Sequence, residues 1–329
     1  MLSVICPIYN EERYIRKCIE SILAQDYPKN NLEVIFADGM STDNTREIIS
    51  EYTAKYPWIR VIDNPQRIVP PALNAAIDAS KGDIIMRLDA HASYEPNYFS
   101  AITTALDKYG ADNAGSVCKT DVLNKTPKAL AIKEILSHPL GVGNSSFRTG
   151  IDGMKEVDTV PFGCWRRSVF NRFGKYNEHL VRNQDIEFNK RIKAGEGKII
   201  IIPDTFCTYY ARETFSKLAE NNYGNGKWNI LTVYYTHQLK SLSLRHFIPL
   251  IFVLSLLLPA IAGFFWHPLW LVGIISFLTY TLIVSLISAK IAVKKHLNFI
   301  YLVTTFFVLH LSYGWGSFIG LLKLPFIKE

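Results

Sequence analysis

The sequence predicts an α/β domain with a mostly parallel, doubly wound sheet, followed by helices embedded in a membrane. Two observations support this fold class. In the first two-thirds of the 329 residues, short apolar runs alternate with amphipathic segments, a strand–helix–strand rhythm typical of parallel sheets covered by helices. After residue 245, long apolar runs replace this alternation.

The alternation can be followed element by element. Short runs rich in Val, Ile and Leu predict buried strands, because strands covered on both faces lack a polar side. The predicted strands are residues 2–9, 32–38, 58–64 and 82–90. The predicted helices are residues 11–25, 41–56, 69–80 and 185–195. A Ser/Thr/Asp cluster opens the second of these helices and can cap its first turn.

Three apolar runs near the C-terminus predict transmembrane helices. They are residues 248–266, 269–289 and 299–322, each near the roughly 20 residues that cross a hydrocarbon core. Buried helices of soluble domains normally keep a polar face, which these runs lack. A soluble helical domain is therefore the weaker alternative.

These patterns divide the chain into three regions. We expect a cytoplasmic domain over residues 1–228, an interfacial amphipathic helix over residues 229–247 and a membrane region over residues 248–329. The expected location is the cell inner membrane, with several crossings.

The net charge of +7 lies entirely in the tail. Residues 1–220 contain 28 basic and 28 acidic side chains, whereas residues 221–329 contain 8 basic and one acidic side chain. Because this excess lies among apolar runs, it fits an anionic membrane surface better than nucleic acid. A predicted loop with Lys290, Lys294 and Lys295 favours the cytoplasmic side. Three crossings would leave the C-terminus outside, although its own lysines favour the inside.

Cysteine usage and the N-terminus add two expectations. The five cysteines form no CxxC pair, so reduced cytosolic thiols are expected rather than disulfides or a zinc site. The first residues, MLSVICPIYNEE, lack a basic segment and a long apolar core, so they predict no signal peptide.

Polar residues follow the predicted strands where each strand ends. These residues are Tyr9 and Asn10, Asp38 and Gly39, Asn64, and the segment Asp89-Ala90-His91. In open α/β sheets, ligands bind beyond the carboxyl ends of the parallel strands. The sequence therefore predicts one crevice lined by residues from separate strands.

Four segments occur in a recognisable order: PIYNEERYI, ADGMSTDNT, RLDAHA and NQDIEFNKRIKAGEG. They resemble the family 2 glycosyltransferases, which have a GT-A fold, over about residues 2–230. RLDAHASY, FGCWRR, NQDIEFN and HLSYGWGSFIGLLK together look more narrowly like succinoglycan-type membrane glucosyltransferases. Those enzymes extend a sugar carried on polyprenyl diphosphate.

The resemblance implies a set of residues around a UDP-sugar donor. They are Pro7, Tyr9, Glu11, Asp38, Arg67 and Asp89. Asp38 would accept the N3–H of uracil, which cytosine lacks; its alternative role is a cap for the next helix. Arg67 would face the diphosphate, and its alternative is an ordinary solvated arginine.

The segment Asp89-Ala90-His91 stands where the family often has Asp-x-Asp. A divalent cation bridging the leaving phosphates would stabilise their charge. Asp89 would contact ribose or metal through water, and His91 would replace the usual ligating carboxylate. Mg²⁺ prefers oxygen ligands and Mn²⁺ accepts imidazole as well, so Mn²⁺ is favoured. The alternative is a histidine that only forms a hydrogen bond in a loop.

The resemblance also implies a general base. Inverting transfer needs the acceptor hydroxyl to lose its proton as it attacks, and the family uses the Asp of a Glu-Asp pair. Here Gln184 replaces the Glu and Asp185 remains. The first turn of a helix favours the ionised carboxylate. The alternative is a plain helix cap.

The resemblance also implies acceptor contacts from three further segments. Trp165 would stack on an acceptor sugar or, alternatively, pack in the core. Arg166 and Arg148 would meet anionic groups. A closing segment near the membrane would supply Arg212, Lys227 and Trp228.

The expected function is transfer of a hexose from a UDP-sugar to a polyprenyl-diphosphate-linked saccharide, in exopolysaccharide biosynthesis. The main alternative makes polyprenyl phosphate itself the acceptor, but an ionised phosphate needs no base such as Asp185. Processive synthases typically carry Gln-x-x-Arg-Trp, where this chain has NNYGNGKW. A non-enzymatic scaffold that binds nucleotide is the remaining alternative. The expected partners are the donor, the lipid-linked acceptor and membrane lipids, without nucleic acid.

Overall fold

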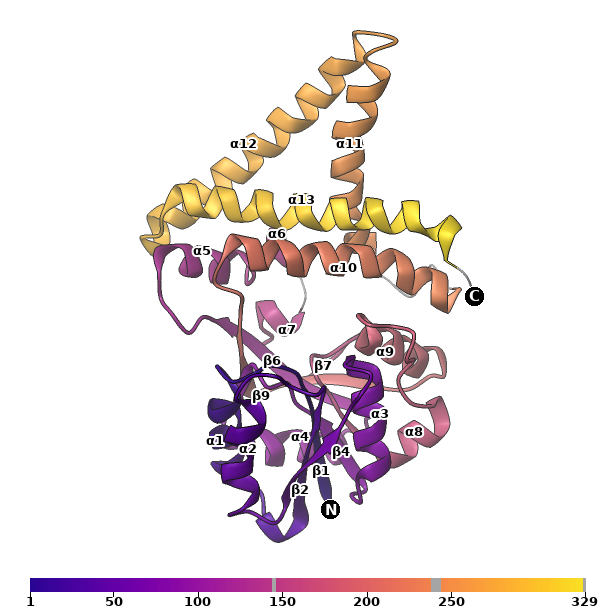
Figure 1. Ribbon diagram of the computed structural model, residues 1–329. Coiled ribbons are helices and arrows are strands. Elements are labelled where there is room, and N and C mark those ends of the chain that lie inside the picture. Colours follow the sequence, from indigo (N-terminus) through magenta and orange to yellow (C-terminus); the bar gives the residue numbers. More distant parts are fainter. Residues whose placement is uncertain (144–145, 238–243, 328–329) are drawn as a thin grey trace. The chain divides into compact units, whose positions relative to one another are not determined.

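The computed structural model describes residues 1–143, 146–237 and 244–327 (Figure 1). The chain forms two compact units. Unit 1 comprises Met1–Lys119 and Ser146–Tyr210, and unit 2 comprises Thr120–Ser145 and Ala211–Glu329. Residues 127–142 therefore group with the C-terminal helices, a division that differs from the one expected at residue 228. Each unit is described by itself below.

The parallel half of the sheet in unit 1 follows the sequence closely. Its strands are β1 (Leu2–Ile8), β2 (Leu32–Asp38), β3 (Ile59–Asp63) and β4 (Ile84–Arg87). They lie in the order β3-β2-β1-β4 and all pair in parallel. Ile8 pairs with Asp38, and Asp38 pairs with Asp63. The carboxyl ends of β1, β2 and β3 therefore lie at one edge.

The other half of the sheet contains antiparallel strands, so the sheet is mixed rather than mostly parallel. The further strands are β5 (Ala92–Tyr94), β6 (Asn113–Asp121), β7 (Lys155–Glu156), β8 (Cys164–Arg166) and β9 (Ile199–Tyr210). β8 pairs antiparallel with both β4 and β6, and β5 and β7 pair antiparallel with β9. β5, β7 and β8 have only two or three residues each, too few for a period to mark them in the sequence, whereas β6 and β9 are long strands that the sequence analysis missed.

Helices cover both faces of the sheet. Successive residues of a strand point to opposite faces, so each face has its own apolar core. Val34 and Phe36 belong to one apolar core, and Ile35 and Ala37 belong to the other. Core residues of the first side come from α1 (Ile15–Leu23), α2 (Thr45–Thr53) and α4 (Tyr98–Lys108). Those of the second side come from α3 (Val69–Ala79), α8 (Arg167–Phe173) and α9 (Gln184–Ala194). A short α7 (Ser146–Thr149) completes the helices of this unit. The predicted double winding is confirmed.

Unit 2 is helical. It contains α5 (Pro127–Ile135), α6 (Pro139–Val142), α10 (Phe215–Thr236), α11 (Ile248–Ala262), α12 (Leu269–Lys295) and α13 (Phe299–Lys323). Two helical segments, Leu269–Lys295 and Phe299–Phe326, are long and apolar enough to cross a membrane, whereas α11 is shorter. The three predicted spans thus reduce to two of sufficient length. Lys290, Lys294 and Lys295 lie in the last turns of α12 rather than in a loop.

Helix α10 begins before the expected interfacial helix and already contains residues 229–236. Residues 238–243 of that prediction lie outside the described part of the chain. α10 and α13 run side by side along their length (Figure 1). The ring centroids of Phe215 and Tyr301 are 6.2 Å apart, and Ser317 donates a 3.1 Å hydrogen bond to the Gly226 carbonyl further along. The two helices are therefore parallel.

Glycines let these two helices approach closely. A Cβ atom at Gly226 would overlap with the carbonyl oxygen of Tyr313, and one at Gly316 would overlap with the carbonyl oxygen of Tyr223. Small residues at helix crossings permit this kind of backbone contact. In contrast, a Cβ atom at Gly273 in α12 would have its nearest neighbour, the Pro259 Cβ, at an ordinary 3.6 Å.

We expect Gly226→Ala to lower the thermal stability of the detergent-extracted protein, because the added methyl group separates α10 from α13. Gly273→Ala is the matched control and should be neutral or slightly stabilising, since Ala favours a helix over Gly by about 1 kcal/mol. Thermal unfolding followed by size-exclusion chromatography measures both variants. Equal midpoints for the two variants would contradict the close packing of α10 on α13.

Candidate active site

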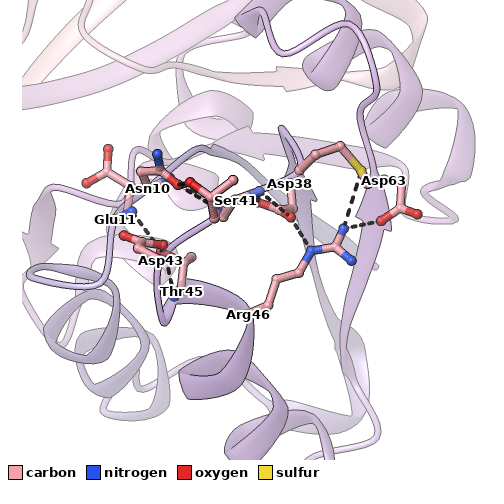
Figure 2. Close-up of polar contacts among 10 residues, drawn as sticks. Asn10, Glu11, Asp38, Ser41, Asp43, Thr45, Arg46 and Asp63 are labelled. Carbon is pink, nitrogen blue, oxygen red and sulfur yellow. Dashed lines mark hydrogen bonds and ion pairs between the residues drawn. The ribbon is translucent and has the colours of Figure 1, made fainter.

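The loops that follow β1 and β2 are joined by hydrogen bonds (Figure 2). The Asn10 backbone N–H donates to Ser41 Oγ at 2.9 Å, and Asn10 Oδ1 accepts from the Thr42 N–H at 2.8 Å. The Glu11 N–H donates to Thr45 Oγ1 at 2.7 Å. These contacts fix the two strand ends relative to one another.

Asp38 lies at the centre of this network and is fully buried. Its carboxylate accepts from the Ser41 hydroxyl at 2.5 Å and forms an ion pair with Arg46. Arg46 also pairs with Asp63, the last residue of β3 (Figure 2). In this conformation Asp38 stabilises a turn, and it is not the cap of α2, which is Asn44. Its contact with uracil stays a prediction.

The other predicted donor residues lie around the same strand ends. Pro7 lies near the end of β1, where it pairs with Ala37 of β2. Tyr9 is 44 % exposed, and its ring lies beside Gly39, where a Cβ atom would come within 3.2 Å. Arg67 is exposed in the turn after β3, with a left-handed φ of 59°. Their roles toward a donor stay predictions.

His91 and Glu11 form a pair at the crevice. His91 Nδ1 lies 3.1 Å from Glu11 Oε1, and both side chains are mostly buried. Because a carboxylate only accepts, His91 Nδ1 carries the proton of this hydrogen bond. This arrangement, with a carboxylate behind the imidazole, is the one that metal-binding histidines commonly have. Glu11 therefore orients His91, a partnership that the sequence did not predict.

Asp89 has a different environment from His91. Its Oδ1 accepts from Arg87 Nε at 3.2 Å and from Arg87 Nη2 at 3.1 Å. An ion-paired carboxylate is a weaker metal ligand than a free one. Among the described residues, no group of three or more His, Cys, Asp or Glu side chains is arranged to hold a metal ion. The residues fit a cation only if the donor phosphates and water supply further ligands.

Asp185 lies in the first turn of α9, as predicted. Asn183 precedes the helix with a left-handed φ of 62°, and Gln184 is buried. The Asp185 carboxylate accepts from the Ile186 N–H at 2.9 Å. Asp185 is also one of the groups that raise the pKa of Arg87, against the lowering effect of burial. The strand end of β4 and the start of α9 therefore lie within electrostatic reach.

A family model described as glycosyl transferase family 2 matches residues 3–174, which include β1 to β8 and the crevice. The chain belongs to this glycosyltransferase family. It is 30 % identical over 226 residues to the succinoglycan biosynthesis protein ExoA of Rhizobium meliloti, covering 68 % of this chain and 67 % of ExoA. This family membership makes the protein a glycosyltransferase.

Two other similar proteins extend the comparison. The chain is 27 % identical over 279 residues to a Methanococcus voltae transferase, covering 79 % of this chain and 86 % of the relative. That relative is a dolichyl N-acetyl-α-D-glucosaminyl phosphate 3-β-D-2,3-diacetamido-2,3-dideoxy-β-D-glucuronosyltransferase. Residues 1–349 of S. aureus TarS superpose with a TM-score of 0.55 at 19 % identity, covering 97 % of this chain and 91 % of that one. This similarity supports a GT-A-like fold.

Two predicted acceptor contacts of this glycosyltransferase are wrong. Trp165 is 1 % exposed and packs in the core with Phe170, Tyr176 and Phe188. Because β8 is antiparallel to β4, Arg166 pairs with Ile84 at the amino end of β4, away from the crevice. The Arg166 guanidinium binds Asp107 at 2.5 Å instead. Neither side chain can touch an acceptor there.

The remaining acceptor candidates lie in two places. Arg148 packs over the Tyr209 ring at 5.5 Å, and the same ring contacts His91 with centroids 5.1 Å apart. Arg148 therefore lies near the predicted metal ligand. Arg212, Lys227 and Trp228 belong to unit 2. Partial burial and the neighbouring Lys323 lower the pKa of Lys227.

Charged partners of the predicted acids were missed by sequence reasoning. Arg46 comes eight residues after Asp38, and Arg87 comes two residues before Asp89. Arginine in a helix or at a strand end is ordinary in sequence, so neither residue carried a signal.

We expect Asp38→Asn to lower the free energy of unfolding by about 1–3 kcal/mol, because Arg46 and Ser41 lose a buried, charged hydrogen-bond partner. Asp63→Asn is the matched control, since it removes the other Arg46 partner at a side chain that is 60 % exposed. An exposed ion pair contributes about 0–1 kcal/mol. Thermal and denaturant unfolding of the two variants measures the difference. A smaller loss for Asp38→Asn than for Asp63→Asn would contradict the central role of Asp38.

Proposed function

We propose that this glycosyltransferase moves a hexose from a UDP-sugar to a polyprenyl-diphosphate-linked saccharide, with inversion and with help from a divalent cation. The observation that carries the proposal is the Glu11–His91 pair close to the Arg87–Asp89 pair, with Asp185 near enough to raise the pKa of Arg87. The names of two relatives, succinoglycan biosynthesis and a dolichyl phosphate-linked sugar acceptor, support a lipid-linked acceptor. S. aureus TarS, whose complex with UDP-GlcNAc superposes with a TM-score of 0.50, supports a UDP-sugar donor.

The proposed reaction is a single displacement. The acceptor hydroxyl oxygen attacks the anomeric carbon and forms the new glycosidic bond. The bond from that carbon to the UDP oxygen breaks, and its electron pair leaves with UDP. Asp185 accepts the proton of the attacking hydroxyl as general base. Attack from the face opposite the leaving group inverts the anomeric centre.

His91 is the proposed protein ligand of the cation, with Asp89 nearby. A bound cation supplies charge stabilisation for the leaving diphosphate. His91 is suited to this task because the Nδ1–H bond to Glu11 orients its ring. A mixed nitrogen and oxygen ligand set favours Mn²⁺ over Mg²⁺. Tyr9 and Asp38 remain the proposed contacts of the uracil base, and Arg67 of the diphosphate.

The basic residues of unit 2 are the proposed acceptor side. Lys227 and Lys323 are close enough for Lys323 to lower the pKa of Lys227. Two neighbouring cations favour an anion such as a lipid-linked diphosphate or an acidic headgroup. We assign Arg212 and Trp228 to the same acceptor side, as the sequence predicted.

The proposed location is the cell inner membrane, with the catalytic unit in the cytoplasm. We propose that α11 and α12 form a hairpin that enters the bilayer, with α13 along its surface. Exposed apolar side chains gather on the hairpin, and its tip carries Phe264, Phe265 and Trp266 at 63–89 % exposure. The 15 residues of α11 span about 22 Å at 1.5 Å per residue. This length is shorter than the hydrocarbon core of a bilayer, which is about 30 Å thick.

The packing of α13 supports this arrangement. One side of α13 is covered by α10, which is too polar to cross a membrane because it carries Lys217, Glu220 and Lys227 among several asparagines. A helix that packs along its length against such a polar partner fits the membrane–water interface better than the centre of the bilayer. With α13 at the surface, the lysines that end α12 and α13 lie on the same side, in accordance with the positive-inside rule.

We expect Lys295→Cys and Lys323→Cys to react with a membrane-impermeant maleimide on the same, cytoplasmic side of sealed vesicles. Phe265→Cys at the hairpin tip should not react from that side. The five native cysteines are all buried, so background labelling should be low, and the unsubstituted chain is the control. Reaction of Lys295→Cys and Lys323→Cys from opposite sides would instead make α13 a transmembrane span.

We expect membrane-extracted protein to hydrolyse or transfer at least one of UDP-glucose, UDP-galactose and the N-acetylated UDP-sugars, in the presence of Mn²⁺. Asp185→Asn should reduce transfer by about 10²–10⁴-fold, the usual contribution of a general base, while UDP binding by calorimetry stays unchanged. Asp204→Asn, at an exposed position of β9, is the control. Inactivity of the unsubstituted protein with every donor would contradict the proposed function. Undiminished transfer to polyprenyl phosphate by Asp185→Asn would favour that alternative acceptor.

A further inference from the structure

Arg87 is a buried arginine at the end of β4, next to the predicted metal segment. It is 6 % exposed, and its backbone N–H donates to the Gly163 carbonyl at 3.0 Å. One edge of its guanidinium, formed by Nε and Nη2, binds the Asp89 carboxylate. A buried charge is costly unless it is paired, so this ion pair fixes both side chains.

The other edge of Arg87 has no partner with full hydrogen-bond geometry, although the guanidinium lies close enough to the Tyr176 hydroxyl to counteract part of the rise in the pKa of Tyr176 that burial causes. Nη1 is buried and has no hydrogen-bond partner within the described part of the chain. Burial lowers the pKa of Arg87, but Asp89, Tyr176 and Asp185 raise it more. The guanidinium therefore stays charged, with Asp89 on one side and Tyr176 and Asp185 within electrostatic reach.

Two more buried polar atoms around this position have no hydrogen-bond partner in the described residues. They are the Tyr176 hydroxyl and Gln184 Oε1. Tyr176 is held by Asn74, which bonds both its backbone N–H and its carbonyl, and Gln184 immediately precedes Asp185. Buried polar groups are nearly always paired, so these atoms are candidates for hydrogen bonds to a bound ligand or to water.

We propose that Arg87 is a positioning residue for sugar transfer, which holds the Asp89 carboxylate in place on the donor side. This inference rests on the proposed function for the identity of the reaction.

The ion pair also determines which ligand the Asp89 carboxylate is suited to bind. Arg87 neutralises the Asp89 charge and leaves carboxylate lone pairs free to accept a further hydrogen bond. Such a carboxylate is suited to a neutral hydroxyl, such as one of the donor ribose, rather than to a direct metal bond. The cation then depends on His91, which is oriented separately by Glu11.

The experiment compares Arg87→Met and Arg87→Lys with the unsubstituted full-length enzyme. We expect Arg87→Met to weaken UDP binding by about tenfold or more and to lower kcat by a similar factor, as for the loss of a charged hydrogen bond. Arg87→Lys keeps the charge but loses the two-point contact, so it should recover part of both losses.

Arg167→Met is the matched control. Arg167 is another arginine with several hydrogen bonds, but its guanidinium binds the carbonyls of Gly82 and Ser80, near the amino end of β4. We expect this variant to lower the thermal midpoint while kcat and the UDP dissociation constant per folded enzyme remain unchanged. A purely structural role for Arg87 would produce this same pattern in Arg87→Met and would overturn the proposal.

A double-mutant cycle tests whether Arg87 acts through Asp89. In an Asp89→Asn background, Arg87→Met should weaken UDP binding by less than about threefold, because the ion pair is already lost. An undiminished tenfold effect in that background would overturn the proposal. If Arg87→Met does not fold, Arg87→Lys provides the test. Wild-type kcat and UDP affinity in Arg87→Lys would also overturn the proposal. An unsubstituted enzyme without activity would instead contradict the proposed function.

Discussion

The parallel pairing of β1 with β2 and β4 is the constraint on which the site depends. In this register Ile8 lies beside Asp38, and Ile5 lies beside Arg87. The loops that leave β1 and β2 must therefore start at one edge of the sheet, where Asn10 and Ser41 join them. A shift of one residue in either strand would turn the side chains to the opposite face. The convergence of these strand ends is a consequence of strand register rather than of any one motif.

Each crevice acid that follows a strand is paired with a cation or an imidazole. Asp38 pairs with Arg46, Asp89 pairs with Arg87, and Glu11 pairs with His91. The paired arginines limit the negative field that an anionic donor would meet. Asp185 differs from these acids: in the described residues it forms no ion pair within 4 Å, and its carboxylate accepts a hydrogen bond from the Ile186 N–H.

The parallel strands and the position of Asp185 were predictable because they depend on local patterns. Apolar runs define β1 and β2 almost to the residue, and a helix with Asp185 in its first turn follows from the period of its apolar side chains. The direction of β8 does not follow from such a pattern. Trp165 and Arg166 were misassigned for this reason: antiparallel pairing with β4 buries the first and carries the second to the opposite edge.

The partners of the acids were unpredictable for a different reason, since Arg46 and Arg87 reach Asp38 and Asp89 only through tertiary geometry. The same holds for the membrane region, where hydropathy alone treats three apolar runs alike. Packing distinguishes them, because the glycines of α10 and α13 bring a polar helix against one apolar run and not against the others. A helix whose backbone packs against a polar helix cannot expose that side to lipid. The surface that remains for lipid is then largest on α12, which is where the exposed leucines, isoleucines and valines are most numerous.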